Sequence, residues 1–274
     1  IECLVGSEMC IRDSFYGDVN EQASGTVGFG YRGRGVFRSI EPHGTTFMHL
    51  ESSWSGKEEF TVAVNSITSD GFGNVYAGAK EKLYKTSDRG EIWNEVNTTN
   101  DGQTISGNVY DVKAFADGSV ILAMGNNYYI SKTGNQNTFK KISNPMETLT
   151  PATGRSVIAI APSDENVVYI SRSNSNDFFD GLFKSEDKGQ TWQRIIGGGS
   201  DVFTPFTGAG GQGNYNQCLA VFPDNPDKIL LGGIDIYEWE KGGNWKKMSR
   251  WNSGWGQHDY VPVSYTHLTL PTML

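Results

Sequence analysis

Residues 83–93 read LYKTSDRGEIW, and residues 182–192 read LFKSEDKGQTW. Both stretches fit the pattern [ST]-x-D-x-G-x-[TI]-W, and in both the pattern follows an apolar residue, an aromatic residue and a lysine. A short β-rich run that meets Asp and Gly at fixed places predicts a strand followed by a tight turn. The two copies therefore predict a protein built on a repeated strand–turn unit.

Weaker copies of the same pattern extend the repeat in both directions. Each copy ends on an aromatic residue, and these residues are Phe47, Trp93, Phe139, Trp192 and Trp245. As the residue numbers show, the intervals between them are 46, 46, 53 and 53 residues. A regular period near this length is typical of the blades of a β-propeller.

A pair of short β-rich runs precedes most copies of the turn. Residues 60–64 precede 74–78, residues 109–112 precede 119–123, residues 157–161 precede 167–170, and residues 219–221 precede 228–233. Short runs joined by Asp, Asn, Gly and Pro read as antiparallel hairpins. With the two strands that flank each turn, a repeat holds four strands, which is one propeller blade. The predicted fold is all-β, a β-propeller fragment of about five four-stranded blades.

The turn residues have a structural explanation. An Asp carboxylate can accept backbone N–H groups inside a tight turn, Gly adopts a positive φ, and a Ser or Thr hydroxyl can hold the turn in place. The Trp that follows buries a large apolar area between blades. The residues that we assign to this structural role are Thr86, Asp88, Gly90, Trp93, Ser185, Asp187, Gly189, Thr191 and Trp192.

Composition and charge argue against several classes of protein. The net charge of −8 over 274 residues, with no basic stripe, speaks against nucleic acid as a partner. No apolar run approaches the ~18 residues that a membrane-spanning helix needs. Cys218 reads as a strand residue, and neither a metal site nor a cofactor is expected. Residues 28–33 match GxGxxG, but a β-like run follows them where a dinucleotide site needs a helix.

The two full copies, with the degenerate ones, resemble the Asp-box (BNR) repeat of β-propellers such as the sialidase, sortilin and xyloglucanase-like proteins. Residues 211–260, which contain YNQCLAVFPDNPDKILLGG, resemble secreted multi-blade proteins of Bacteroidota, many of which leave the cell by type IX secretion. The resemblance implies a secreted or cell-surface protein. It also implies that the boxes lie at the blade periphery and that their aspartates are not catalytic.

The two ends of the chain do not continue the repeat. Residues 4–14, LVGSEMCIRDS, and residues 263–272, VSYTHLTLPT, resemble translated sequencing-adaptor sequence. We therefore expect an adaptor artefact at 1–14, an Asp-box β-propeller fragment at 15–262 and a second artefact at 263–274. We also expect residues 1–14 and 263–274 to pack poorly and to lack repeat partners, and we expect the natural reading frame to be longer.

Two classes of function remain open. The favoured one is a non-catalytic module that binds carbohydrate or protein, with Trp251, Trp255 and Tyr260 as candidate binding residues. The alternative is a glycoside hydrolase, xyloglucanase-like or, with less support, a sialidase, whose Arg-Ile-Pro motif is missing here. Such a hydrolase needs two carboxyl groups across a cleft. The candidates outside the boxes are Asp177, Asp180, Asp201 and Asp259.

Overall fold

The computed structural model describes residues 10–12, 35–39, 47–50, 56–57, 64–142, 154–197, 213–214 and 217–249. The chain forms two compact units, Ile1–Ile142 and Ser143–Leu274. All regular secondary structure in these ranges is β-strand. The same ranges contain no helix that could span a membrane.

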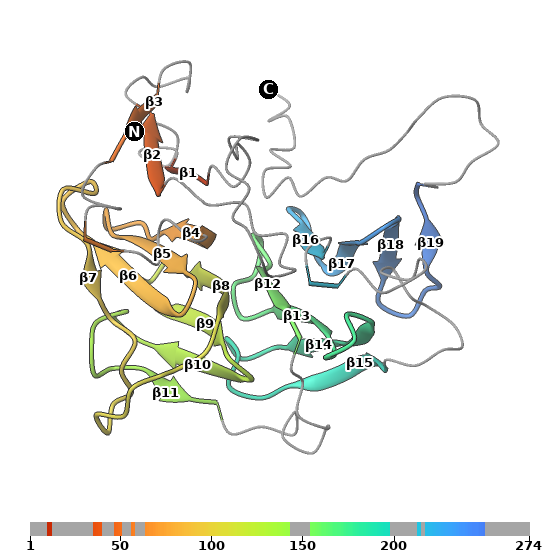
Figure 1. Cartoon of the computed structure of the whole chain (residues 1–274). Coiled ribbons are helices and arrows are strands. Elements are labelled where there is room, and N and C mark those ends of the chain that lie inside the picture. The colour runs from red at the N-terminus through yellow and green to blue at the C-terminus, as the bar shows by residue number, and fades with distance from the viewer. Residues whose placement is uncertain are drawn as a thin grey trace, which may run out of the picture. The chain divides into compact units, whose positions relative to one another are not determined.

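The first unit contains three sheets (Figure 1). Their strands are β1 (Cys10–Arg12), β2 (Val36–Ser39) and β3 (Phe47–His49); β4 (Val64–Ser69), β5 (Val75–Ala79), β6 (Lys82–Thr86) and β7 (Asn94–Glu95); and β8 (Val109–Ala114), β9 (Val120–Met124), β10 (Asn127–Ser131) and β11 (Lys140–Lys141).

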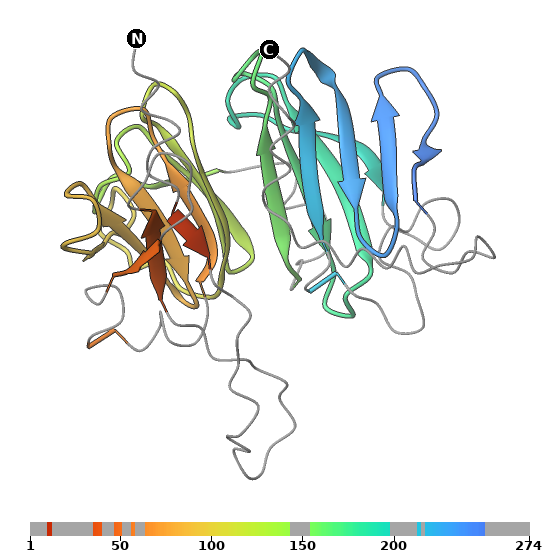
Figure 2. The same ribbon diagram turned by 90° about the horizontal axis from the view of Figure 1, so that it is seen from above.

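The second unit contains two sheets, whose strands run side by side in Figure 2. Their strands are β12 (Ser156–Ile160), β13 (Val168–Ser173), β14 (Phe179–Ser185) and β15 (Gln193–Gly197); and β16 (Cys218–Phe222), β17 (Asn225–Gly232), β18 (Ile236–Glu240) and β19 (Lys246–Lys247).

Within each sheet, every strand pairs antiparallel with its neighbour in sequence. Four sheets are four-stranded meanders, which is the architecture of a propeller blade. The prediction of an all-β propeller fragment is thus confirmed. The first sheet differs from the expected four strands, because its described part has three, in the order β1-β2-β3.

Strand β1 lies inside the segment that we expected to have no partner. Cys10–Arg12 pairs antiparallel with Val36–Arg38 of β2, so for these three residues that expectation is wrong. Backbone N–H and C=O groups pair whatever the side chains are, so an exposed sheet edge accepts a short extended segment of any sequence. β1 lies at the edge of its sheet and not at its centre. The origin of residues 1–14 stays a prediction, and residues 263–274 lie outside the described residues.

Within each unit, the described apolar core lies between successive sheets. Strands β5, β9 and β13 are buried along their whole length, and their sequences VYAGA, VILAM and VYISRS carry few charges. In the first unit, one apolar cluster joins Tyr76 and Leu83 of one sheet to Leu122 and Phe139 of the next. Fully burying such a side chain stabilises the fold by roughly 1.5–3 kcal/mol.

The turn after β6 is held by one hydroxyl and one carboxylate. The Thr86 hydroxyl donates to Asp88 Oδ1 at 2.6 Å and accepts from the Gly90 N–H at 3.0 Å. Asp88 Oδ1 also accepts from the Ile92 N–H at 3.0 Å. Arg89 and Gly90 have φ of +62° and +90°, the left-handed region that favours glycine. The hydrogen bond from Thr86, followed by that from the Ile92 N–H, holds the pKa of Asp88 below its usual value.

The turn after β14 repeats this geometry. Ser185 Oγ donates to Asp187 Oδ1 at 2.7 Å and accepts from the Gly189 N–H at 2.8 Å. Asp187 further accepts from the Thr191 N–H at 2.8 Å and the Thr191 hydroxyl at 2.6 Å. Burial alone would raise the pKa of Asp187, but the bonds from Thr191 and Ser185 outweigh it and lower the pKa. Trp192 Nε1 closes the turn on the Gly189 carbonyl oxygen at 2.9 Å.

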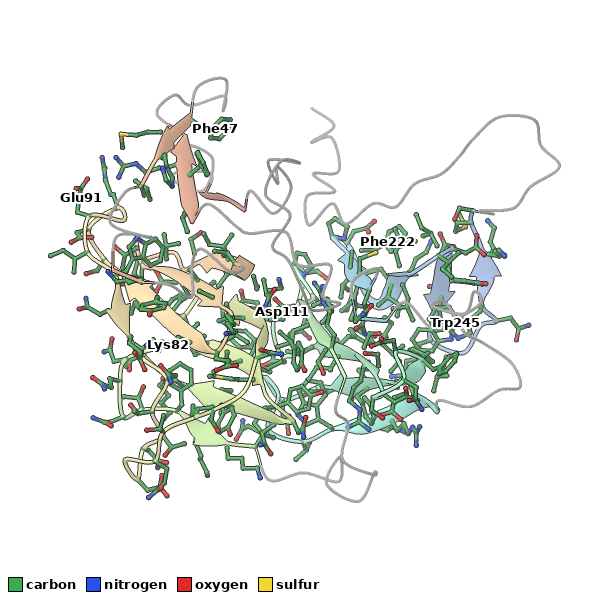
Figure 3. The ribbon with its side chains drawn as sticks, in the orientation of Figure 1. Phe47, Lys82, Glu91, Asp111, Phe222 and Trp245 are labelled. Atoms are coloured by element: carbon green, nitrogen blue, oxygen red, sulfur yellow. The ribbon has the colours of Figure 1, made fainter. Side chains whose placement is uncertain are left out.

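The aromatic residue after each turn does not have the same burial everywhere. Trp93, Phe139 and Trp192 are buried, as the repeat predicts, but Trp245 is only partly buried. Trp245, labelled in Figure 3, stacks on Trp239 with ring centroids 5.9 Å apart. The link between β18 and β19, residues 241–245, contains no Asp, so no carboxylate gathers its N–H groups as in the two full copies.

Two side chains on the paired strands β5 and β6 connect their sheet to the next sheet of the first unit. Tyr76 on β5 lies opposite Lys85 on β6. The Lys85 ammonium donates to the Thr133 carbonyl oxygen at 3.1 Å and to Asn135 Oδ1 at 2.8 Å, both in the loop after β10. The Tyr76 hydroxyl donates to the same Thr133 oxygen. We call this Tyr–Lys pair with its acceptors the inter-sheet clamp.

The second unit has a clamp at the same register. Tyr169 on β13 faces Lys184 on β14, and the Tyr169 hydroxyl donates to the Pro226 carbonyl oxygen at 3.0 Å. The Lys184 ammonium lies 2.6 Å from a carboxylate oxygen of Asp227 and of Glu186. Burial lowers the pKa of Lys184, but the bonds to Asp227 and Glu186 outweigh burial and raise it. Burial also raises the pKa of Tyr169 to about 12.

The other sheets vary at this position. In β2 the cation is Arg38, whose guanidinium donates to the Arg89 carbonyl oxygen in the turn of the next sheet. In β10 the equivalent residue is Ile130, which faces Ile121 on β9. In β18 it is Glu238, which pairs with Lys228 of its own sheet at 3.3 Å. The clamp is therefore a property of particular sheets and not of the repeat as a whole.

Replacing Lys184 with Met removes the charged half of the second clamp. Because Lys184 is 5% exposed and its ion pairs with Asp227 and Glu186 are lost, we expect the free energy of unfolding to fall by about 1–3 kcal/mol. Urea denaturation followed by Trp fluorescence measures it, with the exposed Lys246→Met as the matched control. A double-mutant cycle with Asp227→Asn should show coupling between the two sites, and additive losses would contradict the clamp.

The lowered pKa of Asp187 predicts an acid-dependent loss of stability. The stabilisation from a depressed carboxyl pKa is complete above the unfolded value of about 3.9 and disappears as the pH falls through the folded pKa. We expect Asp187→Asn to weaken the fold at pH 7 by on the order of 1 kcal/mol, since one acceptor oxygen becomes a donor. Urea midpoints between pH 3 and 7 should fall less steeply in this variant than in the exposed Asp224→Asn control. If the urea midpoints of the two variants fell equally steeply with decreasing pH, the assignment of a stabilising, lowered pKa to Asp187 would be refuted.

Candidate binding surface on the second unit

The antiparallel meander sorts the loops of the second unit to two ends. The Ser185–Trp192 turn, between β14 and β15, lies at the same end as the link between β12 and β13. The loop of residues 174–178, between β13 and β14, lies at the opposite end, with the first residues of β12 and β16. Framework turns and the candidate residues Asp177 and Asp180 are thus at different ends of the sheet.

The 174–178 loop is held by its own hydrogen bonds. Asn174 Oδ1 accepts from the N–H groups of Asn176 at 2.9 Å and Phe178 at 3.1 Å. The backbone closes the loop through Asn174 N–H to Phe178 O at 2.8 Å and Asp177 N–H to Asn174 O at 2.9 Å. Asp177 adopts φ of +63°, which Asp tolerates better than most residues. The loop is therefore shaped before any ligand arrives.

A second segment supports this loop from outside the sheet. The Gly213 N–H donates to the Asp177 carbonyl oxygen at 2.8 Å, and Arg155 Nη1 donates to the Asn214 carbonyl oxygen at 3.3 Å. A Cβ on Gly213 would lie 2.5 Å from Ser173 Cβ, which no packed structure allows. Gly213 is therefore the residue that permits the two segments to touch.

The carboxylate of Asp180 is committed to a neighbouring cation. The Arg172 guanidinium donates through Nε at 2.5 Å to Asp180 Oδ2, and its Nη2 contacts the same oxygen. The Arg172 side chain is 4% exposed, and its Cζ lies 5.2 Å from the centre of the Phe183 ring. Arg194 donates to the Asp180 carbonyl oxygen at 2.7 Å. A buried, hydrogen-bonded ion pair of this kind positions the start of β14.

Asp177, three residues away, is in a different environment. Burial raises the pKa of its carboxyl group, with no other cause. The structure therefore separates the two candidate carboxylates: Asp180 is bound to Arg172, and Asp177 carries a raised pKa on the loop surface. No hydrogen bond between them is recorded in the described residues.

The two phenylalanines between these aspartates have opposite roles. Phe179 is 2% exposed and belongs to the core, whereas Phe178 is 38% exposed. Alternation along a strand explains the split, because successive side chains point to opposite faces. An exposed aromatic ring beside polar groups is a surface on which the face of a sugar can stack.

The interior behind the loop is polar, and the buried Gln217 Oε1 has no hydrogen-bond partner in the described part of the chain. Gln217, which is buried, donates through Nε2 to Ser171 Oγ at 2.7 Å. Burial raises the pKa of the neighbouring Cys218 thiol, so this cysteine is not an activated nucleophile. Among the described residues, no group of three His, Cys, Asp or Glu side chains could hold a metal ion.

Several residues singled out by sequence lie outside the described residues. These are the candidate carboxylates Asp201 and Asp259 and the candidate binding residues Trp251, Trp255 and Tyr260. They stay predictions. Sequence reasoning missed the pairing of Arg172 with Asp180, because an ion pair at adjacent strand ends has no pattern of its own. It also missed the clamp lysines, although Lys85 and Lys184 stand next to the turn motif in both full copies.

Comparison with known proteins supports the fold alone. No protein-family model and no curated protein sequence matches the chain. Among solved structures, the chain is similar to an ancestral GH74 enzyme, with a TM-score of 0.55, 18% identity and coverage of 81% of this chain and 31% of that one. It is similar to the GH74 xyloglucanase from Xanthomonas campestris, with a TM-score of 0.54, 20% identity and coverage of 76% and 34%.

A third similar structure is the extracellular domain of a hybrid two-component system from B. thetaiotaomicron. Its TM-score is 0.54 with 12% identity, and the match covers 79% of this chain and 25% of that one. The chain spans between a quarter and about a third of these three proteins. Two GH74 enzymes and the extracellular domain of a two-component system are thus similar in fold to this chain.

Proposed function

We propose that this chain is part of a secreted or cell-surface Asp-box β-propeller that binds polysaccharide without cleaving it. The binding surface in this proposal is the loop end of the second unit, around residues 174–178. An extracellular protein in place of a polysaccharide is the competing ligand. In the same proposal, the turns at Thr86–Trp93 and Ser185–Trp192 are Asp-boxes with a structural role.

The observation that carries the proposal is the exposed ring of Phe178 on a loop that is already ordered. Four hydrogen bonds to and from Asn174 and Asp177 fix the loop, and Gly213 supports it. Binding therefore does not have to order the loop, which lowers its entropic cost. The amide and carboxyl groups beside the ring can bond to sugar hydroxyls.

The environments of Asp88, Asp180 and Asp187 also favour binding over hydrolysis. A catalytic acid of a glycosidase needs a raised pKa, whereas the pKa values of Asp88 and Asp187 are lowered by the turn. The Asp180 carboxylate is held by Arg172. Each of these aspartates has a structural partner that accounts for its presence.

Phe178→Ala tests the surface directly. If the ring stacks on sugar, affinity for a panel of soluble polysaccharides should fall about five-fold, since a stacking contact is worth roughly 1 kcal/mol. Affinity electrophoresis or calorimetry measures it. Phe72→Ala is the matched control, because Phe72 is 69% exposed on the turn between β4 and β5 of the other unit. If both variants and the parent chain bind polysaccharide equally well, the surface around Phe178 is not the binding site.

The glycoside hydrolase alternative rests on one specific observation, the raised pKa of Asp177. In that case Asp177 would act as the acid, and its partner would be a carboxylate elsewhere in the protein. The test is release of reducing ends from the same polysaccharides by the full-length protein. Hydrolysis that is lost in Asp177→Asn and kept in Asp224→Asn would establish the hydrolase and overturn the binding module.

A further inference from the structure

A polar groove lies in the first unit, whereas the candidate surface described above belongs to the second unit. It has a volume of about 500 Å³ and runs between the sheet β4–β7 and the loop that follows β10 of the next sheet. This volume falls within the range of small-molecule sites, roughly 300–1,000 Å³. Its polar lining includes Lys85, Ser87, Asn94, Glu95, Asn135 and Gln136.

The inter-sheet clamp fixes the distance between the two walls of the groove. Lys85 belongs to one wall, and its ammonium bonds to Thr133 O and Asn135 Oδ1 on the other. The Lys85 ammonium also lies 5.3 Å from the centre of the Tyr76 ring. The groove is thus a consequence of sheet docking, and its polar groups hold a defined spacing before a ligand binds.

The lining suits a ligand with no net charge. One cation and one anion face the groove, and each is compensated: Lys85 by its two oxygen acceptors, and Glu95 by Lys82 at 3.3 Å. Burial lowers the pKa of Lys85, while Asp70 opposes this shift. An anion would therefore have to compete with acceptors already in place, and a cation would have to displace Lys82 from Glu95.

The groups left for a ligand are amides and a hydroxyl. Asn94 and Gln136, one from each wall, are exposed, as is Ser87. An amide offers a donor and an acceptor side by side, which matches a hydroxyl that both donates and accepts. The one apolar lining residue, Val96, is buried, so the groove has no recess for an apolar side chain.

We propose that this groove binds a neutral sugar of one or two residues, held by hydrogen bonds from Asn94 and Gln136 across the two walls. The site is separate from the Phe178 surface and does not depend on it. Its occupant would contact two sheets at once, so binding would also strengthen their docking.

The experiment uses the full chain carrying Phe178→Ala, so that the other surface does not contribute. The probes are methyl glycosides of glucose, galactose, mannose and xylose, with the corresponding disaccharides, followed by chemical-shift changes of backbone amides. We expect shifts at residues 94–96 and 133–136. Asn94→Ala and Gln136→Ala should each weaken binding about five-fold, the usual worth of a net hydrogen bond. The control is Gln103→Ala, an exposed amide of the same unit that does not line the groove.

Each outcome decides the proposal. Saturable shifts at the groove that are weakened by Asn94→Ala and Gln136→Ala, and unchanged by Gln103→Ala, support it. It is overturned if no probe binds at 50 mM, if the two variants leave affinity unchanged, or if methyl glucuronide or the capped peptide N-acetyl-triglycine amide binds more tightly at the groove. If the sugars bind at the groove but the chain that keeps Phe178 binds no polysaccharide, this site is retained and the proposed function is rejected.

Discussion

The docking of one sheet on the next is the contact on which the rest of this structure depends. A four-stranded meander cannot bury both its faces alone, so each sheet needs a neighbour. Apolar clusters supply most of the buried area, but they do not fix the register between sheets. In two sheets the inter-sheet clamp adds directional contacts, because Lys85 and Lys184 reach specific oxygens in the following sheet. In two others Ile130 and Glu238 occupy the equivalent position, so the clamp strengthens particular sheet contacts and is not a general requirement of the fold.

The glycines of the turns also contribute to the docking of one sheet on the next. Gly134 has φ of +60°, and a Cβ there would lie 2.3 Å from the Tyr76 hydroxyl. A Cβ at Gly90 would lie 2.5 Å from Leu50 Cδ1. At these two turns, glycine provides the positive φ and also lies against a side chain of the preceding sheet. The degenerate turn after β10 keeps its glycine, while Thr138 takes the place of the Asp carboxylate as partner of Ser131 Oγ.

The two sites proposed here follow from the regularity of the framework. Hydrogen-bonded turns occupy one end of the second unit, which leaves the opposite end for a loop such as 174–178 that carries an exposed ring. In the first unit, the clamp separates two walls by a fixed distance and leaves amide groups between them. In both places a rigid β-scaffold holds polar groups that the scaffold itself does not use, which is the usual condition for selective binding.

The sequence by itself determined the fold class, the repeat and the positions of most strands, because hairpin runs, Gly and Asp at fixed spacing act locally. It also predicted the burial of Trp93 and Trp192. Only the tertiary structure decided that Phe179 is core while Phe178 is exposed, that Asp180 is paired with Arg172, and that Trp245 is half-buried. These outcomes depend on contacts between residues that are separated in the sequence and lie on different strands or loops. A repeat in the sequence specifies which residues recur, but not which of them come into contact.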